Sequence, residues 1–359
     1  MSTSALLDRQ QALGGVLVER VAGAPRSYRF CCPRVLHFGD ATAEYQAVRT
    51  GVALLDVSDR RQIELAGRDA RSFLHNFCTN DIKRLAAGDG CEAFVANVQG
   101  RILAHLFVFA TDVSVWIEAG PGEDAPLVSH FERYVFHEDV QFQVRTAQLG
   151  QLLLTGPRSA EMLAPWMPAA AALELLQHAA CELAGRPCVV RRLDLLGMPG
   201  HLLSVDRTVL ADVWDELVSA GATPVGAEAF HAARIEARFP LYGLDLSADN
   251  LAQEANRTQQ AISFRKGCYL GQEPIARIDS VGHINRELCP VRISSAVVPE
   301  PGAAVVSGEG RPVGVITSAA GVPGESRSVA LACVRTSHSQ AETEVAVLTE
   351  AGRLAARIG

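Results

Sequence analysis

The C-terminal part of the chain has a pattern that strongly restricts its fold. After about Gly282 the sequence consists of short runs rich in β-branched residues, with Gly and Pro between them. Several short strands at close spacing, separated by turn residues, are typical of a small β-barrel. We therefore predict a barrel over residues 283–359. The predicted strands include Val291–Ile293, Val305–Ser307, Val313–Thr317, Val329–Val334, Glu344–Leu348 and Leu354–Ile358.

Helical and strand patterns are mixed in the preceding part of the chain. Apolar residues after Asp40 recur at helical spacing until Gly51, which predicts a helix between a polar N-cap and a glycine C-cap. Residues Leu54 to Leu65 alternate as in one strand, Ile102–Ile117 predicts a hairpin, and an Ala- and Leu-rich stretch after Pro157 predicts further helix. This order favours an α+β fold with helices on one face of antiparallel sheets.

The length of 359 residues exceeds what one compact core usually holds, so we expect several domains. We place a loosely ordered lead-in at 1–34, a first α+β domain at 35–145, a second at 146–282, and the barrel at 283–359.

Composition excludes several classes of protein. The formal net charge is −7 and no long Lys/Arg run occurs, which argues against direct nucleic-acid binding. Nine cysteines occur without the spacing of a disulfide framework or a zinc site, so we expect no metal site. No segment is apolar enough to span a membrane, and no signal peptide is recognisable. We therefore expect a cytoplasmic protein.

One short stretch, from Arg265 to Glu273, has the chemistry of a functional loop. Cys268 follows two cations, Arg265 and Lys266, and nearby positive charge favours a reactive thiolate. Gly267 and Gly271 predict a sharply turned loop that exposes the thiol. The alternative is structural, because free cysteine often packs as a small buried hydrophobe.

The run Lys266–Glu273 resembles the signature of the YgfZ proteins, a folate-binding branch of the glycine-cleavage T-protein (GcvT) superfamily. The resemblance implies two folate-binding α+β portions around a central channel, a C-terminal barrel, and tetrahydrofolate or a one-carbon derivative as cofactor. Further segments resemble the family in order: Val48-Arg49, Leu55–Ser58, Gly67–Ala70, Thr79–Asp81, Asn97–Arg101 and Arg234–Glu236.

The resemblance also implies a site. Glu236 matches the family position whose carboxylate receives the N–H donors of the pterin, a contact that charge makes strong. Arg265 matches a basic residue near the glutamyl tail. Tyr242, Asn97 and Glu118 complete the expected cofactor site, and Cys268 with Lys266 forms the expected reactive group.

One departure bears on the reaction. Aminomethyltransferases carry an aspartate on the strand after the Asn97–Gly100 turn, whereas this chain has Ala104 and His105 there. Alanine can neither take a proton nor stabilise developing positive charge. We therefore predict a folate-binding accessory protein of the YgfZ type, which maintains iron–sulfur clusters in partner proteins through Cys268. The alternatives are a tetrahydrofolate-dependent aminomethyl or methyl transferase and a scaffold that binds no folate.

Overall fold

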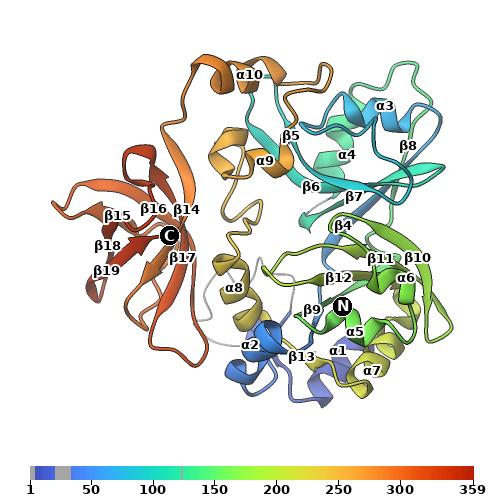
Figure 1. Ribbon diagram of the computed structural model, residues 1–359, viewed down its shortest axis with the longest axis horizontal. Coiled ribbons are helices and arrows are strands. Elements are labelled where there is room, and N and C mark those ends of the chain that lie inside the picture. Colours follow the sequence, from blue (N-terminus) through green and yellow to red (C-terminus); the bar gives the residue numbers. More distant parts are fainter. Residues whose placement is uncertain (1–4, 21–33, 123) are drawn as a thin grey trace.

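The computed structural model describes residues 5–20, 34–122 and 124–359. Figure 1 shows a closed barrel on one side and two sheets on the other, with α8 (Ala227–Glu236) and α9 (Thr258–Ala261) between them. The predicted α+β fold with a C-terminal barrel is confirmed. In the described part of the chain, no helix combines the length and the apolar character needed to cross a membrane.

The first sheet has five antiparallel strands in the order β5-β6-β7-β4-β8. One face packs against α3 (Ala70–His75) and α4 (Asp124–Glu132), where Phe73 and Phe131 are buried against strand residues such as Ile117. Because side chains along a strand alternate, every second residue points to the opposite, inner face. The strands are β4 (Arg60–Ala66), β5 (Gly90–Ala96), β6 (Ile102–Ala110), β7 (Ser114–Pro121) and β8 (Gln141–Val144).

The second sheet has six strands in the order β10-β11-β12-β9-β3-β13, of which only β3 and β13 pair in parallel among those described. Helices cover its outer face and bury Leu163 and Trp214 there. The strands are β3 (Ala53–Asp56), β9 (Leu149–Thr155), β10 (His178–Leu183), β11 (Arg186–Arg192), β12 (Gly200–Asp206) and β13 (Thr223–Pro224), and the helices are α1 (Ala5–Ala12), α5 (Ser159–Leu163), α6 (Pro168–Ala171) and α7 (Leu210–Ser219).

The barrel closes as β14-β17-β16-β15-β18-β19. Val305, Ala330 and Val347 are completely buried in its interior. Each predicted β-rich run lies inside one of these strands. The strands are β14 (Arg286–Ile293), β15 (Ala304–Ser307), β16 (Pro312–Gly321), β17 (Ser328–Arg335), β18 (Glu344–Thr349) and β19 (Gly352–Ile358).

Two packed helices, α2 (Ala41–Thr50) and α8, lie between the second sheet and the barrel, where α2 contacts β3 and β13 and α8 contacts β16 and β17. The predicted cap of α2 is confirmed, because Asp40 Oδ1 accepts hydrogen bonds from the backbone N–H groups of Thr42 and Ala43, both at 3.0 Å. The largest core contains Phe230 of α8 together with residues of both sheets and of the barrel. This shared core fixes the inner faces of the two sheets relative to each other. Another helix, α10 (Gln272–Val281), precedes the barrel.

The segment Leu54–Leu65 was predicted as one strand, and this prediction is wrong. It forms two strands that belong to different sheets. Between them Asp56 Oδ1 accepts hydrogen bonds from the backbone N–H and the hydroxyl of Ser58, at 3.1 and 2.6 Å, and this local bonding turns the chain. The chain thereby passes directly from the second sheet into the first, although the predicted domain boundaries themselves stay a prediction.

Two further segments differ from expectation. Residues 5–20, expected as a loose lead-in, contain α1, β1 (Val16–Leu17) and a short 3₁₀ turn, because Leu6 packs into the core of the second sheet and β1 pairs with β2 (Val35–His37). The rest of that lead-in, 1–4 and 21–33, lies outside the described residues. The stretch after Pro157, expected as helix, gives two short helices and then the β10–β11 hairpin.

Candidate functional site

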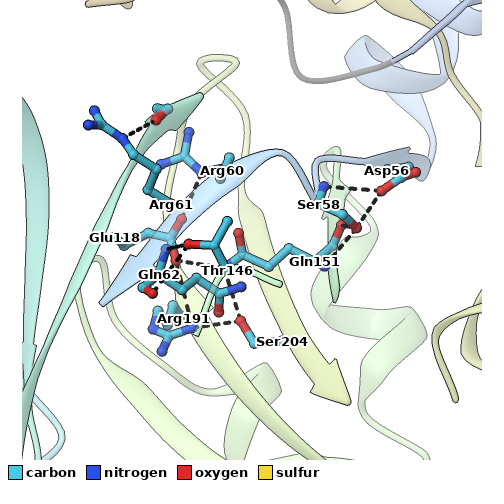
Figure 2. Close-up of polar contacts among 11 residues, drawn as sticks. Asp56, Ser58, Arg60, Arg61, Gln62, Glu118, Thr146, Gln151, Arg191 and Ser204 are labelled. Atoms are coloured by element: carbon cyan, nitrogen blue, oxygen red, sulfur yellow. Dashed lines mark hydrogen bonds and ion pairs between the residues drawn. The ribbon is translucent and has the colours of Figure 1, made fainter. Parts of the chain in front are cut away.

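Polar side chains from the inner faces of the two sheets meet in the interior of the protein. In β7, Ile117 and Ala119 belong to the core under α3 and α4, so Glu118 between them points to the inner face. Gln62 of β4 lies opposite Glu118 in the strand pairing and shares that face. Gln151 of β9 reaches Glu118 from the second sheet. We call Arg60, Gln62, Glu118, Gln151, Arg191 and Ser204 the polar centre (Figure 2).

The polar centre holds more positive than negative charge. Arg60 Nε donates to Glu118 Oε1 at 3.0 Å, and Gln151 Nε2 donates to Oε2 at 2.6 Å. Arg191 Nη1 lies 4.0 Å from Glu118 Oε2 and donates to Ser204 Oγ at 2.7 Å. All three charged side chains are buried, and burial lowers the pKa of Arg191. Two guanidinium groups therefore share one carboxylate in a region that excludes water.

Several buried atoms of the polar centre have no hydrogen-bond partner among the described residues. They are both amide atoms of Gln62, Oε1 of Gln151 and Nε of Arg191. Buried polar groups are normally paired, so each of these atoms needs an explanation. The guanidinium carbon of Arg191 also lies 5.5 Å from the ring centroid of Trp116 and 5.4 Å from that of Phe109. Free donors and acceptors beside aromatic rings suit a flat heterocycle with polar edges.

The two residues at the position of the missing aspartate, Ala104 and His105, point to opposite faces of the first sheet. The side chain of Ala104 lies in the core under α3 and α4, on the face away from the polar centre. His105 is the residue of this pair on the inner face, where its Nε2 lies 2.7 Å from Glu92 Oε1. Arg257 forms an ion pair with the same carboxylate. Burial alone would raise the pKa of Glu92, but Arg257 and His105 outweigh it and lower the pKa to about 2. His105 is thus fixed in a buried network.

Glu236 lies at the last residue of α8 and is already engaged by protein donors. Its Oε1 accepts from Arg327 Nη2 at 2.9 Å, and its Oε2 lies 3.3 Å from Arg49 Nη2. The hydroxyl of Tyr45 also donates to Oε2. Burial, and then this hydrogen bond, raise the pKa of Tyr45. The two arginines offset the unfavourable position of a carboxylate at a helix C-terminus.

A pocket of about 180 Å³ opens beside Glu236, between α2, α8 and the barrel. Among the described residues that line this pocket, Glu236 has the one carboxylate side chain. Four arginines line the same pocket, and two of them have in addition ion pairs outside the lining, Arg327 with Glu325 and Arg292 with Glu342. The pocket therefore attracts anions more than cations. We call it the arginine pocket; the four are Arg49, Arg238, Arg292 and Arg327.

Tyr242 contacts the start of β6, and Asn97 lies in the turn that precedes it. Tyr242 is half-buried, which raises its pKa, and its hydroxyl donates to the carbonyl oxygen of Ile102 at 3.4 Å. The Asn97 Oδ1 atom accepts from the backbone N–H groups of Gln99 and Arg101, at 2.9 and 3.0 Å. Asn97 thus stabilises the turn between β5 and β6.

Cys268 lies on an exposed loop, as its glycines predict. Of the seven cysteines in the described residues, it is the exposed one. Gly271 ends the loop with φ of 81°, and a Cβ there would lie 2.2 Å from the carbonyl oxygen of Asn97. Only glycine fits such a close approach in this conformation. Arg265 on the same loop is also exposed.

Lys266 fixes this loop to the end of α3. Its ammonium group donates to the carbonyl oxygens of His75, Cys78 and Asn80, the last two at 2.6 and 3.0 Å. It also lies 4.7 Å from the ring centroid of Tyr269. Burial lowers the pKa of Lys266 to about 8. The three N–H donors are all used, so Lys266 positions the loop, and the prediction that it takes part in chemistry stays a prediction.

The predicted site residues thus lie in three places. Glu118 belongs to the polar centre, Glu236 to the arginine pocket, and Asn97 lies beside the loop of Cys268. Among the described residues, no hydrogen bond or ion pair joins Glu236 to Glu118 or to Cys268. The sequence analysis missed five members of the polar centre, all except Glu118. The sequence signal for them was weak, because Arg60, Arg61 and Gln62 are consecutive polar residues and do not alternate with apolar ones.

Comparisons with known proteins agree with this architecture. Residues 6–266 match the model of the GCVT N-terminal domain, and residues 286–359 match the glycine cleavage T-protein C-terminal barrel domain. An aminomethyltransferase of Symbiobacterium thermophilum is 27% identical over 90% of this chain and 89% of its own length. A putative chloroplastic transferase of Arabidopsis thaliana is 28% identical over 77% of this chain and 63% of its own. The crystal structure of glycine cleavage system aminomethyltransferase T from Bartonella henselae has the same fold, with a TM-score of 0.84, 20% identity, and 98% and 95% of the two chains covered.

Proposed function

Because this chain belongs to the family of the GCVT N-terminal domain and the glycine cleavage T-protein barrel domain, we propose that it binds tetrahydrofolate and transfers a one-carbon unit. The observation that supports this most directly is the polar centre. Its unpaired amide and guanidinium atoms are buried between two sheets, beside Trp116. A protein that only needed stability would fill such a place with apolar side chains.

The residues of the polar centre fit the pterin part of tetrahydrofolate. A pterin edge presents N–H donors next to a carbonyl acceptor. The Oε1 atom of Gln151 accepts, the Nε of Arg191 donates, and the amide of Gln62 does both. Trp116 supplies an aromatic face. Glu118 keeps the two buried guanidinium groups in place.

The arginine pocket fits the anionic glutamyl part. Guanidinium groups bind carboxylates with two parallel hydrogen bonds, and four such groups line this pocket, two of them also paired with carboxylates outside the lining. The role predicted for Glu236, to receive the pterin donors, stays a prediction. Both of its oxygens already accept from arginines or Tyr45, and these surroundings favour an anion as the neighbouring ligand.

One-carbon transfer is supported by the relatives. The Symbiobacterium protein, named aminomethyltransferase, matches about nine tenths of each chain, which favours a transferase over the accessory role predicted from the sequence. When bound, tetrahydrofolate supplies the nitrogen atoms that carry the one-carbon unit. The inner face of β6 provides His105, held by Glu92, in place of a carboxylate. We therefore propose aminomethyl or N-methyl compounds as the donor class.

An accessory role in iron–sulfur cluster maintenance is the second candidate. It is favoured by the exposed thiol of Cys268, on a loop that Lys266 and Gly271 hold in a fixed conformation. The motif around this thiol resembles that of the YgfZ proteins. Both candidates require tetrahydrofolate, and only the second requires the thiol.

A fluorescence titration tests the binding step. Trp116 adjoins the polar centre, whereas Trp214 is buried in the core of the second sheet. Tetrahydrofolate should quench the tryptophan emission, and Trp116→Phe should remove most of the quenching while a Trp214→Phe variant retains it. Equal quenching in wild type and Trp116→Phe would place the ligand elsewhere.

A turnover assay tests the transfer step. Purified protein is given tetrahydrofolate with an aminomethylated carrier protein or with an N-methyl amine, and the one-carbon product on folate is measured. Product formation from either donor, dependent on both folate and protein, is the expected result. Binding without any turnover would reject transfer and leave the accessory role.

A further inference from the structure

Three sulfur atoms converge on the outer side of the second sheet, away from the polar centre. Cys181 of β10 and Cys188 of β11 lie directly opposite each other in the hairpin pairing. The hairpin turns at Ala184 and Gly185, with φ of 49° and 75°, as a two-residue turn with positive φ at both positions requires. This short turn fixes the register, so the two thiols are held side by side.

The third sulfur comes from the residue before α6. The Sγ atom of Cys181 lies 3.0 Å from the Sδ atom of Met167 and 3.4 Å from the carbonyl oxygen of Cys188. Met167 and Cys188 are buried, whereas Cys181 is partly exposed and provides access from solvent. A hydrogen bond between the thiols lowers the pKa of Cys181 and raises that of Cys188. The pair therefore offers one solvent-accessible sulfur and one buried sulfur.

The donor set determines which ion fits. Thiolate and thioether sulfur are soft ligands that select Cu(I) over Mg²⁺ or Ca²⁺, which require oxygen. Structural zinc takes four ligands, usually Cys and His. Within the described part of the chain, no three His, Cys, Asp or Glu side chains converge on one point. The two cysteines and the methionine therefore fit a soft ion that needs only two or three ligands.

We propose that Cys181, Cys188 and Met167 form a binding site for one soft monovalent metal ion of the Cu(I) class. The ion replaces up to two thiol protons, which pass to solvent, and forms two Cu–S bonds to the cysteines and a third to the thioether. No electron is transferred. The site is independent of the proposed folate function.

A disulfide is the competing use of the same pair. Opposite residues of an antiparallel pair have Cα atoms about 4.5–5.5 Å apart, within the range for a disulfide. A thioether takes no part in a disulfide. A substitution of Met167 should therefore weaken metal binding and leave disulfide formation unchanged.

The test is a competition between the reduced protein and the colorimetric Cu(I) chelator bicinchoninate. Wild type should take one equivalent of Cu(I) from the chelator. Its affinity for this ion should be about tenfold or more above that of Met167→Leu. Leucine has nearly the volume of methionine, so the fold should persist, which thermal unfolding checks. Met162→Leu, on the neighbouring α5, is the matched control and should bind as wild type does.

Because the chain has nine cysteines, the readout must be specific for the site. One equivalent of Cu(I) should protect Cys181 from iodoacetamide, measured on its own peptide, before it protects Cys268. Equal affinity of wild type and Met167→Leu would overturn the three-sulfur site. Labelling of Cys181 that Cu(I) does not slow would overturn it as well.

Discussion

Replacement of Gln62 by methionine separates stability from ligand binding in the polar centre. Neither amide atom of Gln62 has a hydrogen-bond partner among the described residues, and its side chain is completely buried. A buried polar group without a partner costs about 1–3 kcal/mol. Methionine has a similar length and no strong donor or acceptor. We therefore expect Gln62→Met to raise the free energy of unfolding of the ligand-free protein by about 1 kcal/mol.

The same substitution should weaken tetrahydrofolate binding. If the pterin pairs with the amide, the variant loses one or two neutral hydrogen bonds, each worth about 0.5–1.5 kcal/mol, or roughly 3–30-fold in Kd. Gln151→Met is the matched control, because Gln151 Nε2 donates to Glu118 and to Ser204. That control should lower stability as well as affinity.

Urea unfolding without ligand and a fluorescence titration with tetrahydrofolate measure the two effects. The reasoning requires opposite signs for Gln62→Met, with greater stability and weaker binding. A variant that is less stable yet binds as wild type does would show that Gln62 is a structural residue with partners in solution.

Two further predictions concern charges. Glu236→Gln removes the one carboxylate side chain from the lining of the arginine pocket. A triglutamyl folate should then bind about 2–10-fold more tightly, as expected for about 1 kcal/mol of lost charge neutralisation near the surface. Tenfold weaker binding of the monoglutamyl form in isothermal calorimetry would instead identify Glu236 as the pterin partner. The pKa of Lys266 is about 8 in the folded protein, below its usual value near 10.5. The unfolded chain therefore binds more protons between those pH values, so the stability should rise with pH across this window. Lys266→Met should lose that rise in urea unfolding, and an unchanged pH profile would contradict the buried location.

The fold could be predicted where local pattern and pairing agree. Each β-rich run of the barrel became part of a strand, because its β-branched residues favour the extended conformation, and β14 and β16 even continue through Pro290 and Gly314. The helix after Asp40 began and ended as its caps predicted. The prediction of one strand at Leu54–Leu65 failed because the alternation of apolar and polar residues continues across a turn. The pattern does not reveal that the two halves belong to different sheets. The β10–β11 hairpin was missed because the Ala-rich run 169–172 just before it favours helix.

The candidate site could be predicted only in part, for a related reason. Cys268 lies within one short motif, and its two glycines indicate an exposed loop whatever the rest of the chain does. The polar centre combines residues of β4, β7, β9 and β11, which strand pairing and sheet packing bring together over long sequence separations. Glu118 was predicted by resemblance, whereas Arg60, Gln62 and Arg191 look like ordinary surface residues of strands until both sheets are placed.

Replacement of Cys268 by serine decides between the two proposed functions. The side chain is exposed, so serine leaves no buried hydroxyl without a partner, and the melting temperature should stay close to that of wild type. Serine is much less acidic and a poor ligand for iron or sulfur species, so any reaction of the thiol is lost. Tetrahydrofolate affinity should not change, because the polar centre is built by other strands.

The activity of iron–sulfur enzymes in a deletion strain complemented with Cys268→Ser then gives the answer. If the protein acts through its thiol, this activity should fall to the level of the deletion, while folate-dependent turnover, where present, persists. Val98→Ser, at another exposed position beside α10, is the control for a change in surface polarity. Full client activity with Cys268→Ser would reject Cys268 as the working thiol and so remove the observation that favours the accessory role. One-carbon transfer would then stand alone, because none of the residues proposed to bind its folate depends on that loop.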